Sequence, residues 1–125
     1  MLHDEIVNFE VAKLAKEKGF PLQKVIKQDG RTFFCELPQS HPDWANCDAW
    51  YLPTQSLLQR WLREEKGIHI SVEYEWVEGI DDWTFYAYIK KVNNAKVVDD
   101  AIKSGFNTYE LALEETLKYA LENLI

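Results

Sequence analysis

Residues 53–90, PTQSLLQRWLREEKGIHISVEYEWVEGIDDWTFYAYIK, decide the fold, because a helix there leads directly into a β-hairpin. Apolar and polar residues alternate over 68–76 and again over 83–90. Such alternation places the apolar side chains of each strand on one face of a sheet. The segment 78–81 between the two runs has the length of a hairpin loop, and Gly79 can adopt a positive φ there.

This loop sets the register of the predicted hairpin. It places Trp76 opposite Trp83 and Tyr74 opposite Phe85, all on the apolar face. A slip by one residue would turn the glutamates of the first strand into the core, so we expect the register to be firm. We interpret the four aromatic residues as part of the core. A platform that binds a nucleobase or a sugar is the alternative.

The helix before the hairpin is predicted over 54–66. Thr54 is a good N-cap, and Gly67 suits the left-handed residue at which many helices end. The chain should therefore reverse sharply at Gly67 and enter the first strand. The apolar stripe of this helix consists of Leu57, Leu58, Trp61 and Leu62.

The N-terminal part of the chain predicts another helix and another hairpin. Residues 5–18 have the periodicity of an amphipathic helix, which ends at Gly19. Two short runs follow at 23–27 and 32–37, and Asp29-Gly30 between them is a strong hairpin signal.

Two segments, 38–53 and 91–106, read as irregular connections, and the last helix begins at Asn107 or Thr108. We therefore predict one α+β domain over residues 1–125, in the order αββαββα. Its antiparallel sheet has about four strands, with the helices mainly on one face. The expected core comprises Leu57, Leu58, Trp61, Leu62, Ile70, Val72, Tyr74, Phe85, Leu113, Leu117 and Leu121.

Composition and charge narrow the classes of function. A net charge of −7 argues against broad binding to a phosphate backbone. A local basic patch of Lys24, Lys27 and Arg31, or an acidic surface that mimics DNA, stays open as an alternative. No apolar run approaches the roughly 20 residues that span a bilayer, and the N-terminus lacks the pattern of a secretory signal. We expect no membrane partner.

Two cysteines, Cys35 and Cys47, are too few for a disulfide scaffold, so we expect reduced thiols in a cytoplasmic protein. A thiol nucleophile formed by either cysteine with His41 or His69 is an alternative that lacks a local sequence signature. An acid/base pair of glutamates on the polar face of the hairpin is a second alternative, although a solvated sheet face explains them as well. We assign no catalytic residue and no cofactor.

The segment 38–53 is the place where we expect a binding site, because long aromatic loops in small domains are often functional or packed. The candidate binding residues are Trp44, His41, Asp43 and Trp50. No metal is assigned, since the spacing of the potential ligands matches no zinc motif. We expect Trp44 to be more exposed than Trp50 and to anchor a partner.

The motif PTQSLLQRWLRE, together with the opening EVAKLAKEKGF and the closing FNTYELALEETLKYALENL, resembles small uncharacterised proteins from phages and prophages of gut Bacteroidetes. The likeness covers about half the chain and departs in 38–51. It implies a small accessory protein in a bacterial cytoplasm and carries no established activity or site residues. We expect a non-catalytic binding or modulatory module with a protein partner, as a monomer or a homodimer. A nucleic-acid-associated protein, or an enzyme that uses 38–53, is the alternative.

Overall fold

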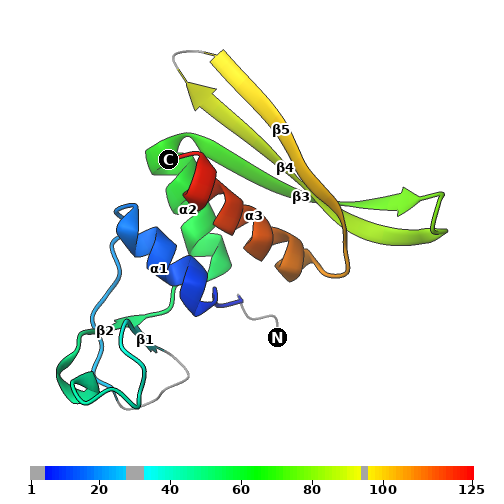
Figure 1. The fold of residues 1–125 in the computed structure, drawn as a ribbon. Helices are drawn as coiled ribbons and strands as arrows, with labels where there is room; N and C mark the ends of the chain where they lie inside the picture. Colours follow the sequence, from blue (N-terminus) through cyan, green and yellow to red (C-terminus); the bar gives the residue numbers. More distant parts are fainter. Residues whose placement is uncertain (1–4, 28–32, 94–95) are drawn as a thin grey trace.

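The computed structural model describes residues 5–27, 33–93 and 96–125. Two helices, α2 and α3, pack on one face of a three-stranded antiparallel sheet, and α1 packs against α3 (Figure 1). A small two-stranded sheet lies beyond α1. Along the chain the elements are α1 (Phe9–Glu17), β1 (Phe33–Cys35), a 3-10 turn η1 (Trp44–Asn46), β2 (Ala49–Tyr51), α2 (Gln55–Lys66), β3 (Ile68–Val77), β4 (Asp82–Asn93), β5 (Lys96–Phe106) and α3 (Tyr109–Asn123).

Local capping chemistry sets the helix ends. The Thr54 hydroxyl accepts a hydrogen bond from the Leu57 amide at 3.2 Å, and Gly67 ends α2 in the left-handed conformation, at φ 65°. Thr108 caps α3 in the same way, which confirms the predicted start of that helix. Helix α1 begins only at Phe9, behind an Asn8 cap, and is shorter than the predicted 5–18.

The register of the β3–β4 hairpin is confirmed pair by pair. Val77 lies opposite Asp82, Trp76 opposite Trp83, and Ile70 opposite Ile89. Inward-facing residues near the helices, such as Ile70 and Ile89, are buried, and the intervening residues of β3 face away from α2 and α3. The alternation in the sequence was therefore sufficient to define this pairing.

The predicted hairpin of 23–27 with 32–37 is wrong. Strand β1 pairs with β2, and the segment around Lys24 joins the other edge of β2, where Lys24 forms an isolated bridge with Trp50. The Asp29-Gly30 turn lies outside the described residues. A turn signal indicates where a chain can reverse, whereas the choice of partner strand depends on residues far away in the sequence.

The prediction that 91–106 is irregular is also wrong. Strand β4 continues to Asn93, and β5 pairs with it from Asn93 opposite Lys96 to Phe85 opposite Phe106. The sheet therefore has three strands, and the other two form a separate sheet, in place of one four-stranded sheet. β5 is a strand because it pairs with β4, whereas its own sequence lacks the alternation that would predict a strand.

The core lies between α2, α3, α1 and the inner half of the sheet. Leu58, Leu62, Leu117 and Leu121 are fully buried in it. Three predicted core residues are not in it: Leu57 is 51% exposed, Tyr74 is 56% exposed, and Phe85 is half-buried outside the core cluster. Successive residues of a helix point in different directions, and Leu57 faces solvent while Leu58 is buried. No helix within the described part of the chain is long and apolar enough to cross a membrane.

Candidate functional site: an exposed aromatic ladder

The β3–β4 hairpin is longer than the helices that cover it. Ten residues of β3 extend over about 33 Å at roughly 3.3 Å per residue. The 15 residues of α3 extend over about 22 Å at roughly 1.5 Å per residue. About 11 Å of strand, or roughly three residues, must therefore extend past the helix even if the two run side by side. Figure 1 shows the end of the hairpin projecting beyond α3.

The projecting part also lacks a third strand. The pairing of β5 with β4 ends at Phe106 opposite Phe85, so the sheet narrows to two strands beyond this point. We call residues 74–85 the ribbon. A two-stranded ribbon has little independent stability unless its side chains pack on each other or on a partner.

One face of the ribbon carries an aromatic ladder, formed by Tyr74, Trp76, Trp83 and Phe85. The ring centroids of Tyr74 and Phe85 are 4.7 Å apart, those of Tyr74 and Trp83 4.9 Å, and those of Trp76 and Trp83 5.8 Å. At the inner end, Tyr109 at the start of α3 meets Phe85 edge to face, with centroids 6.3 Å apart. The ladder therefore begins beside the first residue of α3.

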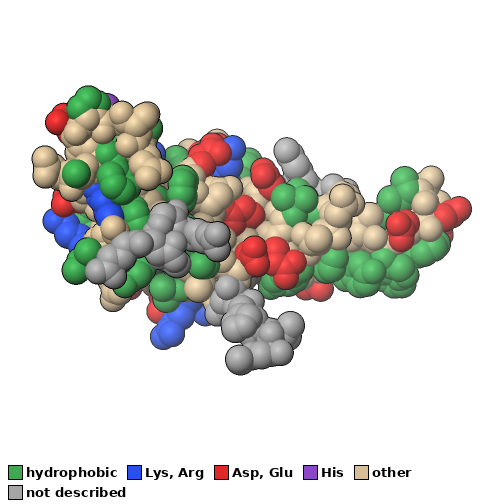
Figure 2. Space-filling view, turned by 90° about the horizontal axis from the view of Figure 1, so that it is seen from below, with side chains coloured by type: hydrophobic (Ala, Val, Ile, Leu, Met, Phe, Trp, Pro, Cys, Tyr) green, Lys and Arg blue, Asp and Glu red, His purple; other side chains and the backbone are tan. Residues whose placement is uncertain are grey.

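The outer part of this ladder is open to solvent, so its assignment to the core is wrong there. Trp76 is 48% exposed and Trp83 50% exposed, in addition to Tyr74. With roughly 200 Å² of surface for each large aromatic side chain, these three residues expose about 300 Å². That area is comparable to the largest apolar patch of a typical monomer, and such patches are often functional. Figure 2 shows an apolar band along the projecting end of the molecule.

Negative charge surrounds the ladder. Residues 72–88 contain five carboxylates and no lysine or arginine. Two of them, Glu73 and Glu75, belong to β3 and alternate with the ladder residues on the opposite face of the sheet. The other three lie at or beside the turn of the hairpin: Glu78, Asp81 and Asp82. The ribbon thus combines an apolar face with an acidic rim.

The other face of the sheet is polar. Residues His69, Ser71 and Lys90 surround a hollow there together with Glu73 and two tyrosines of β4. Glu73 is exposed and Glu75 is half-buried, so the pair has the character of a solvated sheet face.

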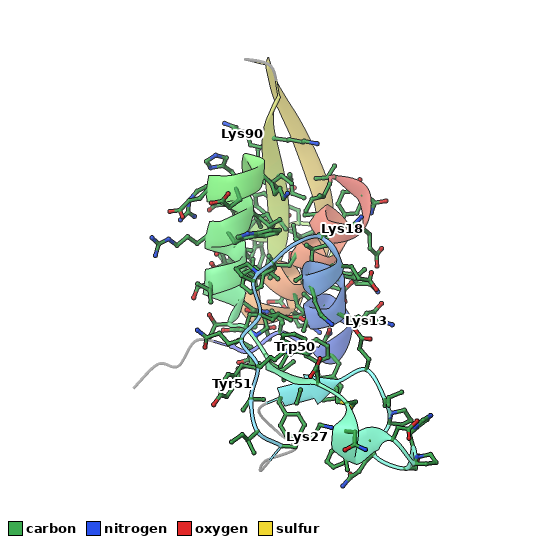
Figure 3. All side chains as sticks on the ribbon, turned by 90° about the vertical axis from the view of Figure 1, so that its left-hand side faces the viewer. Lys13, Lys18, Lys27, Trp50, Tyr51 and Lys90 are labelled. Atoms are coloured by element: carbon green, nitrogen blue, oxygen red, sulfur yellow. A yellow bond between two sulfur atoms is a disulfide. The ribbon has the colours of Figure 1, made fainter. Side chains whose placement is uncertain are left out.

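The four candidate residues of 38–53 are engaged in contacts within the protein. The Nδ1 atom of His41 accepts a hydrogen bond from the Asp43 amide at 3.1 Å. The Lys27 ammonium lies 4.6 Å from the ring centroid of Trp44, and the Lys16 ammonium lies 4.5 Å from that of Trp50. Figure 3 shows Trp50 below α1. Both tryptophans are half-buried, and Trp50 packs against the core. The greater exposure of Trp44 stays a prediction.

The prediction of two reduced thiols is wrong, because Cys35 and Cys47 form a disulfide. Pairing of β1 with β2 sets Cys35 opposite Ala49, which places the start of β2 and its preceding residues beside it. A disulfide has no free thiolate, so a cysteine nucleophile is absent from this state. The Lys27 ammonium donates a hydrogen bond to the Cys47 sulfur at 3.0 Å. Within 5–27, 33–93 and 96–125, no group of three or more acidic, histidine or cysteine side chains is arranged to hold a metal.

Two residues of the predicted basic patch, Lys24 and Lys27, make contacts within the protein. Lys24 forms an ion pair with Asp48 at 3.4 Å, and Lys27 contacts the loop as described above. Arg31 lies outside the described residues.

Sequence reasoning placed the four ladder residues on one face and missed that this face is open. A comparison of the predicted strand with the predicted helices by length, together with the acidic and lysine-free composition of 72–88, could have indicated it. No family model matches the chain, and neither the curated proteins nor the solved structures include a match.

Proposed function

We propose that this protein is a non-catalytic binding module that holds a protein partner against the aromatic ladder. The observation that carries the proposal is the exposure of three adjacent large aromatic side chains on a projecting ribbon. Tryptophan and tyrosine are enriched among the residues that dominate protein–protein binding energy. A patch of about 300 Å² is a reasonable apolar centre for an interface that buries roughly 800 Å² on each partner.

The charge of the ribbon favours a protein over a nucleic acid. Its carboxylates would repel phosphates, whereas the tryptophan rings and the acidic rim both attract lysine and arginine side chains. That the protein is an accessory protein of a phage or prophage stays a proposal. The cytoplasmic location does too, and the Cys35–Cys47 disulfide weighs against it, because disulfides persist mainly in oxidising compartments.

Selection from a library of random peptides tests the proposal without a known partner. The folded protein is immobilised, and enriched peptides are measured against the wild type and against the double variant Trp76→Ser/Trp83→Ser. The matched control is Leu57→Ser, which removes an equally exposed apolar side chain that lies on α2 and is not part of the ladder.

We expect the ladder variant to lose the enriched peptides and the control to keep them. Circular dichroism and urea unfolding confirm that both variants are folded. Peptides that bind the ladder variant as tightly as the wild type would remove the basis of the proposal.

A further inference from the structure

The outer edge of β3 presents backbone groups without a strand beside them. β3 is the terminal strand of its sheet, in the order β3-β4-β5. The side-chain amide of Gln59 on α2 donates a hydrogen bond to the Ile70 carbonyl at 2.8 Å, which shows that Ile70 points its backbone groups away from β4. Backbone groups of alternate residues point the same way, so those of Val72, Tyr74 and Trp76 also point outward.

Gln59 and α2 thus cover the inner part of this edge, and the outer part is uncovered. In the described portion of the chain, no residue pairs with the outward backbone groups of Val72, Tyr74 or Trp76. Open edges of this kind are templates for pairing with another strand, and native proteins usually protect them.

Side chains beside this edge differ between the two faces of the sheet. Tyr74 and Trp76 lie on the ladder face, and Glu73 and Glu75 lie on the polar face. A strand added next to β3 would alternate its own side chains between the same two faces. It would meet aromatic rings with every second residue and carboxylates with the residues between them.

We propose that the β3 edge from Val72 to Trp76 receives an extended segment of a partner protein as an additional strand, in which lysine or arginine alternates with apolar residues. Main-chain hydrogen bonds to β3 supply affinity, as in other cases of strand addition. The apolar residues extend the ladder, and the basic residues pair with Glu73 and Glu75 across the strands. This inference rests on the proposed function and specifies the chemistry of the partner.

A second copy of this chain fits the edge poorly. Antiparallel pairing of two copies of 72–76 would set the carboxylates of Glu73 and Glu75 against those of the other copy, which is destabilising. The same two glutamates that oppose self-pairing attract a basic strand.

Three peptides of equal length test the side-chain pattern: one alternates lysine with valine, one has the same lysines and valines in two separate blocks, and one alternates glutamate with valine. Binding is measured by calorimetry and by the fluorescence of the tryptophans. We expect only the alternating lysine peptide to bind. The variant Glu73→Lys/Glu75→Lys should weaken this peptide about 2- to 30-fold, for two cross-strand charge pairs, and should favour the glutamate peptide instead.

Two N-methylated forms of the alternating peptide test the strand pairing itself. One is methylated on the valine amides and the other on the lysine amides. In antiparallel addition the valines share a face with Tyr74 and direct their amides to β3, so methylated valines abolish binding and methylated lysines do not. Parallel addition reverses the two results. Amide exchange of Val72, Tyr74 and Trp76 should slow when the unmethylated peptide binds.

The two proposals fail in different ways. If the two methylated peptides bind equally well, or both fail, or if the block peptide binds as tightly as the alternating one, the edge inference is overturned. The proposed function then still stands provided that Trp76→Ser/Trp83→Ser loses the library peptides. If the selected peptides bind the Trp76→Ser/Trp83→Ser variant as tightly as the wild type, the proposed function fails whatever the methylated peptides do.

Discussion

Replacing Trp83 with alanine separates the stability of the ribbon from that of the core. The Trp83 ring contacts Tyr74 and Trp76, with centroids 4.9 and 5.8 Å away. Each aromatic pair contributes about 0.5–1.5 kcal/mol, so the variant should weaken the closed ribbon by about 1–3 kcal/mol. Half of the Trp83 side chain is exposed in the wild type, so the mutation leaves no cavity in the core.

The free energy of global unfolding should change much less. Opening of the ribbon breaks its own pairs, whereas the sheet from Phe85 inward and the packing of α2 and α3 stay intact. A mutation in the ribbon can therefore reduce global stability by no more than the ribbon's own free energy of opening, which is small for two strands. We expect a global loss below about 1 kcal/mol.

Native-state hydrogen exchange measured by NMR gives both quantities. The amides of Glu75 and Thr84, which face each other in the ribbon, should exchange up to about 5-fold faster in Trp83→Ala, because the acceleration cannot exceed the ribbon's own opening free energy of about 1 kcal/mol. Amides of α3 should keep their protection, and urea unfolding should give nearly the wild-type midpoint. A global loss as large as that of a buried leucine, with equal acceleration in α3, would show that the ribbon is part of the core and refute the reasoning.

Three further predictions concern the body of the protein. Leu117→Ala, at a fully buried site, should cost about 2–5 kcal/mol in urea unfolding, whereas Leu57→Ala should cost below about 0.5 kcal/mol; similar losses would contradict the assigned face of α2. Thiol titration of the denatured, unreduced protein should count no free thiol, and Cys35→Ser should cost about 2–4 kcal/mol; two titratable thiols would contradict the disulfide. A hydrogen bond and the charge of Glu10, 3.0 Å away, raise the pKa of Lys118 above 10.5. The stabilisation from this pair is complete below pH 10.5 and is lost as the pH rises through the higher folded pKa, so the stability of Glu10→Gln should fall less than that of the wild type over this range.

Features that depend on neighbouring residues were predictable. The Thr54 cap, the left-handed Gly67 and the register from Val77 to Ile68 each depend on residues a few positions apart. The pairing of β1 with β2 was not, because Phe33 lies opposite Tyr51 and the intervening chain has no regular pattern. The disulfide was missed for the same reason, since Cys35 and Cys47 approach each other only after these strands pair.

The candidate site shows the same division. The predicted site in 38–53 followed from aromatic residues in an irregular segment, and the structure holds Trp44 and Trp50 there against lysines. Cation–π contacts of this kind depend on where Lys27 and Lys16 come to lie, which a local pattern does not reveal.

The sequence by itself determined that Tyr74, Trp76, Trp83 and Phe85 share one face, because strand side chains alternate and the 78–81 loop leaves one register. Only the tertiary structure decided that the outer part of this face is open. Burial requires a second element of sufficient length in the right place, and α3 begins at Tyr109, beside Phe85, and runs away from the ribbon. Periodicity indicates which residues lie together on a face, whereas solvent exposure depends on what the rest of the chain can cover.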